Sequence, residues 1–307
     1  MNISRRIGAS SLEALPIALG TGNFGWRIPG GRAIEQLDTF VELGGSLLDT
    51  ADSYSSGRSE QIIGTWMRNR GNRDDVVVAT KVGKSDDFPG LSRRSIRSAV
   101  DASLERLQTE HIDLLYFHAE DPRVNLEESL AAVAALIDEG KVRALGASNF
   151  SPDLLIQARV LASSGLPRFE ALALEQSLVR RDVVDASVQM ALSGQGISLM
   201  PYFVLAHGYI GKYRDLKSAK YAETHLRRAL KYQKRSNHQI LRDLDAVAME
   251  HGVDISTVAL AWSLAQPNVG ASTIGVDNLR ELEALMYAAT IHLTSEQLRK
   301  LERASAR

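Results

Sequence analysis

The segment Ser46-Leu47-Leu48-Asp49-Thr50-Ala51-Asp52-Ser53-Tyr54 joins a short apolar run to two reactive side chains. The run ends in the carboxylate of Asp49, and Tyr54 follows five residues later in a predicted loop. Two later apolar runs end in the same manner, residues 76–81 at Lys81 and residues 112–118 at His118. Strands that each end in a chemically active residue predict a site at one end of a sheet or barrel.

Outward from this segment, apolar strand patterns alternate with helical patterns at a repeat of about thirty residues. No change of composition and no Gly/Ser/Pro-rich linker divides the series. The sequence therefore predicts one α/β domain over residues 1–307, a (β/α)8 TIM barrel, with a short N-terminal hairpin in residues 2–15. The expected strands are 15–19, 46–50, 76–81, 112–118, 142–149, 169–175, 197–202 and 270–275. The expected helices include 183–192, 239–251, 255–265, 279–289 and one from Ser295.

A long polar stretch, residues 206–238, follows the seventh predicted strand and is expected to be a loop on the active face. It contains a basic helix for which a solvated face is favoured over an anion-binding role. The basic residues of that helix are Arg227, Arg228, Lys231, Lys234 and Arg235.

The bulk composition is that of an ordinary globular protein, with 44% hydrophobic and 24% charged residues. The 36 Lys and Arg balance the 37 Asp and Glu, so no net field indicates a nucleic-acid or membrane partner. The chain has no cysteine, which excludes disulfides, thiolate metal sites and a cysteine nucleophile. The first residues lack the apolar region of a secretory signal, and we expect a cytoplasmic protein.

The first predicted strand ends in Gly20-Thr21-Gly22-Asn23-Phe24-Gly25, which matches the pattern G-x-G-x-x-G. A dinucleotide-binding turn of the Rossmann type requires the third glycine to open a helix at once. Here residues 26–31 intervene before the helical pattern begins. A glycine-rich strand end is therefore the favoured interpretation.

The four residues Asp49, Tyr54, Lys81 and His118 each have an ordinary structural explanation when taken singly. Their places at or just past successive strand ends make one shared cavity the better interpretation. A nearby ammonium favours the phenolate and is expected to lower the pKa of Tyr54, and a carboxylate would hold that ammonium in place. Such a group can protonate a carbonyl oxygen or deprotonate an alcohol. The sequence has no G-x-S-x-G, H-E-x-x-H or P-loop motif, and we expect no metal.

Several ordered motifs resemble those of the aldo-keto reductase superfamily over nearly the whole chain. These are Leu48 to Tyr54, Ser59-Glu60, Ala79-Thr80-Lys81, Leu114 to His118 with Asp121-Pro122, Gly146 to Phe150, Leu205 to Tyr213 and Ala259 to Trp262. The resemblance implies a (β/α)8 barrel and an NAD(P)-dependent oxidoreductase that interconverts a carbonyl, in an aldehyde, ketone or keto-sugar, and its alcohol.

The resemblance also implies a role for each matching residue. Tyr54 would be the proton donor, Lys81 the residue that lowers its pKa, Asp49 the anchor of Lys81, and His118 the residue that orients the substrate. The implied cofactor-binding residues are Gly20, Thr21, Gly22, Ser148, Asn149, Gln176, Tyr202, Leu205, Gly275, Asp277 and Arg280.

Three departures from the family pattern bear on the cofactor. Ala173 stands where the family has a glutamine, and Phe203-Val204 stands where it has Ser-Pro. After the last strand, Asp277 and Glu281 replace the basic or amide residues that favour a 2′-phosphate. We therefore expect NADP(H) or NAD(H) as cofactor, with NAD(H) used at least as well.

Two further interpretations remain open from the sequence. One is a non-catalytic, cofactor-sensing regulatory protein on the same fold, and the other is a binder that has lost nicotinamide affinity. Trp26, Phe88 and Tyr209 are candidate walls of the substrate pocket. The expected partner is a small-molecule carbonyl or alcohol, and the sequence does not distinguish a monomer from a homo-oligomer.

Overall fold

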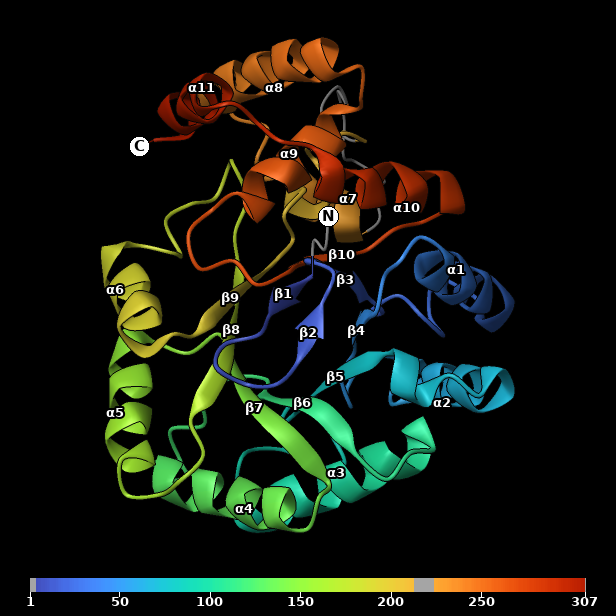
Figure 1. Ribbon diagram of the computed structural model, residues 1–307, viewed down its shortest axis with the longest axis vertical. Helices are drawn as coiled ribbons and strands as arrows, with labels where there is room; N and C mark the ends of the chain where they lie inside the picture. Colours follow the sequence, from blue (N-terminus) through green and yellow to red (C-terminus); the bar gives the residue numbers. More distant parts are fainter. Residues whose placement is uncertain (1–3, 213–223, 307) are drawn as a thin grey trace.

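Eight parallel strands form the centre of the molecule and helices surround them, as predicted (Figure 1). The computed structural model describes residues 4–212 and 224–306. The strand order in the sheet is β10-β3-β4-β5-β6-β7-β8-β9, and a parallel bridge between Leu199 and Val269 joins its two ends. The strands are β3 (Ile17–Gly20), β4 (Leu47–Asp49), β5 (Val77–Val82), β6 (Ile112–Phe117), β7 (Val142–Ser148), β8 (Phe169–Glu175), β9 (Ser198–Tyr202) and β10 (Ser272–Ile274).

The helices follow the strands along the chain and cover the outside of the barrel (Figure 1). The α-helices are α1 (Gly30–Glu42), α2 (Arg58–Arg70), α3 (Arg93–Leu107), α4 (Leu126–Asp138), α5 (Pro152–Ala162), α6 (Ala186–Gln195), α7 (Thr224–Leu230), α8 (His238–His251), α9 (Ile255–Leu264), α10 (Leu279–Met286) and α11 (Ser295–Ser305). Short 3₁₀ turns are η1 (Arg73–Asp75), η2 (Ala206–Gly208), η3 (Arg235–Asn237) and η4 (Tyr287–Thr290).

The predicted N-terminal hairpin is present and closes one mouth of the barrel (Figure 1). It pairs β1 (Arg5–Arg6) with β2 (Glu13–Ala14). The amide of Gly8 donates to Ser198 Oγ at 2.8 Å, and the amide of Ala9 donates to Glu170 Oε2 at 2.6 Å. Both acceptors lie near the amino ends of their strands, so the hairpin leaves the carboxyl ends open for a site.

The barrel interior is filled mainly by small side chains and one tyrosine. Alanines from β3, β5, β7 and β8, and Ala271 just before β10, belong to the interior cluster together with Leu47, Leu114 and Met200. Tyr116 fills the remaining space, and a Cβ at Gly146 would lie 2.5 Å from its ring. Gly146 therefore allows the tyrosine to fit, which gives the glycine of the Gly146-to-Phe150 motif a packing role.

Two predicted helices differ from the structure by three residues at an end, whereas those predicted at 239–251 and 255–265 differ by one residue. The helix expected at 183–192 begins at Ala186, because the side chain of Asp185 caps it by accepting from the amide of Val188 at 2.9 Å. The helix expected at 279–289 ends at Met286 and continues as the 3₁₀ turn η4. Part of the predicted 206–238 loop, residues 213–223, lies outside the described residues.

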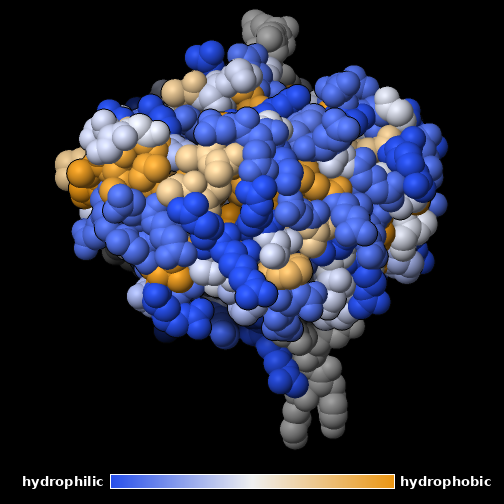
Figure 2. All heavy atoms as spheres, turned by 90° about the horizontal axis from the view of Figure 1, so that it is seen from below, coloured by the Kyte–Doolittle hydropathy of each residue, from blue (hydrophilic) through white to orange (hydrophobic). Residues whose placement is uncertain are grey.

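The face of the molecule drawn in Figure 2 is mostly hydrophilic, with separate hydrophobic areas between the polar side chains. Scattered hydrophobic residues of this kind are normal on globular proteins. Within residues 4–212 and 224–306, no helix is both long enough and apolar enough to cross a membrane.

Candidate active site

Strand alternation sends one set of side chains into the barrel at the carboxyl ends of the strands. Leu47, Ala79 and Leu114 belong to the interior cluster. Side chains two residues apart share a face of a strand, so residues further along with the same parity point into the same mouth. Seven residues of that parity line one cleft, and their sequence positions fit the alternation: Gly20, Asp49, Lys81, His118, Ser148, Ala173 and Tyr202.

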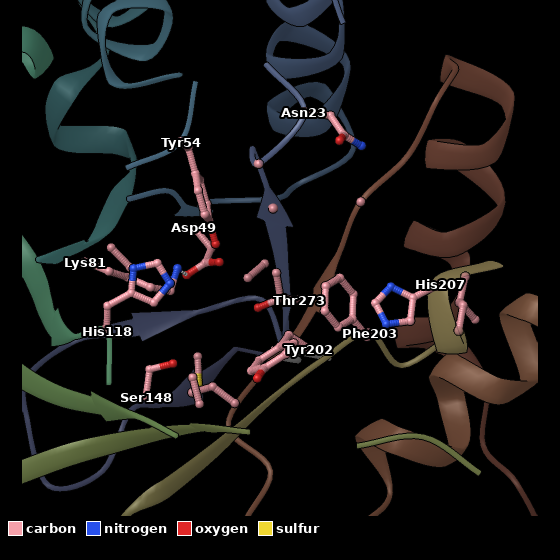
Figure 3. A pocket seen from close by; sticks show the side chains of 18 of the residues that line it. Asn23, Asp49, Tyr54, Lys81, His118, Ser148, Tyr202, Phe203, His207 and Thr273 are labelled. Carbon is pink, nitrogen blue, oxygen red and sulfur yellow. Dashed lines mark hydrogen bonds and ion pairs between the residues drawn. The ribbon is translucent and has the colours of Figure 1, made fainter. Parts of the chain in front are cut away.

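The cleft at this mouth has a volume of about 630 Å³ and extends toward α10. The four residues predicted to be catalytic lie together in it, as Figure 3 shows. Lys81 Nζ donates to Asp49 Oδ1 at 2.7 Å and to the carbonyl oxygen of Thr50 at 2.9 Å. Burial works against the charge of Lys81, but Asp49 and then Tyr54 outweigh it and raise the pKa of Lys81 above its ordinary value.

Tyr54 does not come from a strand but from the turn that follows β4. Its amide donates to the carbonyl oxygen of Ala51 at 3.1 Å, and Ser55 Oγ anchors the turn by donating to the carbonyl oxygen of Phe24 at 2.7 Å. The ring of Tyr54 lies with its centroid 5.2 Å from Lys81 Nζ and 6.0 Å from the centroid of the His118 ring. The turn therefore holds the phenol beside the ammonium and the imidazole.

The expected direction of the Tyr54 pKa is wrong for this cleft. Burial raises the pKa of Tyr54 above its ordinary value, and the attraction of Lys81, which favours the phenolate, only partly offsets it. Desolvation disfavours any charged form, and the depth at which the phenol lies cannot be predicted from the residues around it in the chain. Tyr54 is thus a neutral phenol near neutral pH, the form that can donate a proton.

His118 is a neutral imidazole in this environment. Burial lowers its pKa to about 3, and the positive charges of Lys81 and Lys84 add to that effect. A neutral imidazole keeps one N–H donor and one acceptor nitrogen. Its position beside Tyr54 places this neutral donor next to the phenol in the cleft.

Ser148, Asn149 and Tyr202 form the part of the cleft wall that continues from His118. Asn149 Nδ2 donates to Ser148 Oγ at 3.0 Å, and Tyr202 Oη donates to Asn149 Oδ1 at 2.6 Å. Asn149 has a φ of 58°, a left-handed conformation that asparagine tolerates. These contacts fix a polar edge and an aromatic face side by side.

Phe203 and Ala173 mark where the chain departs from its family pattern, and both line the cleft. Phe203 is 40% exposed, and the centroid of its ring lies 3.9 Å from that of His207. Ala173 offers no polar group to the cleft. The departures therefore replace polar contacts with apolar surface.

A charge cluster closes the end of the cleft next to α10. Lys212 Nζ donates to Asp277 Oδ2 and to Glu281 Oε2, each at 2.7 Å. The amide of Asp277 also donates to Glu281 Oε2 at 2.9 Å. The cluster places two carboxylates and one ammonium together at this end of the cleft. Gly275, just before it, has open space where a side chain would begin.

Three of the predicted cofactor-binding residues do not line the cleft. Thr21 is fully buried and donates to the carbonyl oxygen of Asp49, so it supports the wall from behind. Gln176 is buried on the opposite parity of β8. Arg280 lies in a separate surface depression bordered by α8, α9 and α10. The remaining predicted residues, Gly20, Gly22, Ser148, Asn149, Tyr202, Leu205, Gly275 and Asp277, do line it.

Of the three residues predicted to be walls of the substrate pocket, one lines the cleft and two do not. Trp26 lines the cleft, but Tyr209 is fully buried among α8 and α9, and Phe88 packs against the outer core. The sequence reasoning missed Asn23, Lys84 and Thr273, which line the cleft, and it missed the part of Lys212 in the charge cluster. The alternation of side chains along β10 could have identified Thr273, whereas Lys84 lies in a loop that gives no periodic signal.

The basic helix in the long segment is only partly a solvated face. Lys231, Lys234 and Arg235 are exposed, as expected. Arg228 is also exposed, but it lines the cleft. Among the described residues, no group of three or more His, Asp or Glu side chains is placed to hold a metal ion.

Comparison with known proteins agrees with this geometry. The model of the aldo/keto reductase family matches residues 16–306. The chain belongs to the aldo/keto reductase family. It is 32% identical to an aryl-alcohol dehydrogenase of Pestalotiopsis microspora, with 96% of this chain and 80% of the relative covered. It is 31% identical to norsolorinic acid reductase B of Aspergillus parasiticus, with 96% and 82% covered. An uncharacterized oxidoreductase of Bacillus subtilis is 33% identical, with 96% and 93% covered.

This aldo/keto reductase is therefore an NAD(P)H-dependent oxidoreductase of carbonyl compounds and alcohols. The described residues fit such a cofactor. The cleft runs from Tyr54 to the open space beside Gly275, and it offers the polar edge of Ser148 and the flat ring of Tyr202 on the way.

Proposed function

We propose that the chain reduces a carbonyl compound with Tyr54 as the general acid, and oxidises the alcohol with the same residue as the general base. The observation that carries the proposal is the buried group in which Lys81 bridges Asp49 and the Tyr54 phenol. A reduced nicotinamide supplies hydride to the carbonyl carbon when it is bound. Tyr54 Oη then donates its proton to the carbonyl oxygen.

Each neighbour of Tyr54 has its own part in that step. Lys81 stabilises the phenolate that is left after the proton has moved, because a charge in a dry cleft acts strongly. Asp49 keeps the buried ammonium charged and in place. His118, as a neutral donor, holds the carbonyl oxygen in reach of Tyr54. Ser148 and Asn149 would hold the carboxamide of the cofactor, and Tyr202 would stack on its ring.

The proposed cofactor preference is NAD(H) at least as much as NADP(H). The support is the presence of two carboxylates, Asp277 and Glu281, at the α10 end of the cleft. Its carboxylates repel a 2′-phosphate and can accept a hydrogen bond from a ribose hydroxyl. Lys212 pairs with both carboxylates and weakens this repulsion. Titrating the protein with NAD⁺ and with NADP⁺ tests this directly, and much tighter binding of NADP⁺ would refute it.

The test of the catalytic role is Tyr54→Phe. We expect kcat for an aromatic aldehyde to fall by about 10²- to 10⁴-fold, because a positioned proton donor contributes that much. The Kd of NADH, measured by its fluorescence, should stay within about twofold of wild type. Tyr287→Phe is the matched control, because Tyr287 is 56% exposed and lies outside the cleft. Full activity in Tyr54→Phe would remove Tyr54 from the role.

A further inference from the structure

Lys84 is a cation in the wall of the cleft that the catalytic group does not use. It follows β5, in the loop after Lys81, and lines the cleft with an exposed side chain. The other two lysines of the cleft have acidic partners, Lys81 with Asp49 and Lys212 with Asp277 and Glu281. Among the described residues, no hydrogen bond or ion pair engages the Lys84 ammonium.

Lys84 lies on the side of the cleft mouth where Tyr54 and His118 would meet the substrate oxygen. It does not lie on the side of the charge cluster of Lys212, Asp277 and Glu281. In the strand order β10-β3-β4-β5, three strand spacings separate the strand before Lys84 from the strand before Asp277. At about 4.8 Å each, these spacings set the two loops on different sides of the mouth. The neighbours of Lys84 are instead Lys81, whose charge lowers the pKa of Lys84, and His118, whose pKa the charge of Lys84 lowers.

The charged neighbour that acts on Lys84 is another cation, Lys81. Burial, and then the like charge of Lys81, lower the pKa of Lys84, so its ammonium gains no stabilisation from its neighbours. An anion beside it would supply what the protein does not.

We propose that the carbonyl substrate carries a carboxylate, and that Lys84 binds this group while Tyr54 and His118 hold the carbonyl oxygen. This inference rests on the proposed function, since it names the class of compound reduced at the same site. The ion pair between Lys84 and the substrate carboxylate favours a carbonyl acid over a neutral carbonyl compound, because the neutral compound leaves the cation of Lys84 uncompensated. Lys84 is a specificity-determining residue and takes no part in the transfer of the proton.

The test compares each carboxybenzaldehyde with its methyl ester, which has nearly the same shape and no charge. The 2-, 3- and 4-substituted compounds are used, so that one places the carboxylate within reach of Lys84. The measured quantity is the ratio of kcat/KM for the acid to kcat/KM for the ester, with NADH and with NADPH. We expect a ratio of at least about ten for one isomer in the wild type, and a decrease of this ratio with added salt.

Lys84→Met removes the charge and keeps the length of the side chain, and it should lower the ratio about tenfold. Lys84→Arg should restore it, which a purely structural role of the lysine would not predict. Lys231→Met is the matched control, since Lys231 is exposed and lies outside the cleft. A wild-type ratio near one, or an unchanged ratio in Lys84→Met, overturns the inference while reduction of the ester leaves the proposed function standing. If the wild type reduces neither the acids nor the esters, both fail.

Discussion

Asp52 gives the sharpest prediction about stability, because its carboxyl group is buried next to another carboxyl group. Asp52 is 2% exposed and Glu60 is fully buried. Burial, and then the charge of Glu60, raise the pKa of Asp52 to about 7, although the amides of Ser53 and Gly83 and the charge of Arg106 oppose the rise. Asp52→Asn keeps the shape of the side chain and removes its titration. We expect the variant to lose the pH dependence of stability that Asp52 causes.

The sign and size of the effect follow from linkage. The carboxyl of Asp52 has a pKa of about 7 in the folded state and about 3.9 in the unfolded chain, so the folded state holds its proton more tightly. This contribution to stability is fully present below pH 4 and is lost as the pH rises to 7 and slightly beyond. Between pH 5 and pH 8 the wild type should lose about 2 to 3 kcal/mol relative to Asp52→Asn, from about 1.36 kcal/mol for each pKa unit.

Urea unfolding at pH 5, 6, 7 and 8, followed by the fluorescence of the three tryptophans, measures this difference. The comparison uses the first unfolding transition, since a barrel of this size need not unfold in one step. Asp87→Asn, in an exposed loop, is the control and should parallel the wild type. If Asp52→Asn and the wild type keep a constant difference in unfolding free energy from pH 5 to pH 8, the argument from burial is wrong.

Two further predictions concern packing and the cofactor. Gly64→Ala should destabilise the fold by about 1 to 3 kcal/mol, because the added Cβ would lie 2.7 Å from the carbonyl oxygen of Leu107 on α3. Gly31→Ala, where no atom lies within 4 Å, should be neutral or stabilising in the same thermal melt, and equal losses in both variants would contradict the clash. Glu281→Gln should tighten NADP⁺ about three- to tenfold while changing NAD⁺ less, as measured by fluorescence titration. Equal changes for the two cofactors would show that the carboxylate does not discriminate.

Much of the barrel was predictable because its signals are local. Each strand is a short apolar run, and the places of Asp49, Lys81 and His118 at strand ends also identified them as residues of one mouth. The cofactor-binding role that the resemblance implied for Gln176 is not supported, because Gln176 is buried on the opposite parity of β8 and does not line the cleft. Local signals therefore predicted the catalytic group better than the contacts carried over from the family pattern.

The features that the sequence did not predict depend on long-range contacts or on how deeply a side chain is buried. Lys212 meets Asp277 across 65 positions of the chain, and no periodic pattern relates them. Tyr209 follows a family motif yet lies buried between helices, because the turn after β9 directs it away from the mouth. The pKa of Tyr54 took the opposite direction from the expected one, since burial depends on everything that packs around the phenol.

The stagger between neighbouring strands explains why a lysine, and not a shorter cation, serves this site. In the sheet, Asp49 pairs in register with Ala79, so Lys81 lies two residues, or about 6.6 Å, further toward the mouth. Its long side chain returns to Asp49 while its Nζ still lies 5.2 Å from the centroid of the Tyr54 ring. Tyr54 can then occupy a turn above the strand ends, where it lines the cleft, while the Lys81 side chain remains 4% exposed. The register of β4 and β5 thus separates the half-buried position of the Tyr54 ring at the cleft from the dry position of the Lys81 charge.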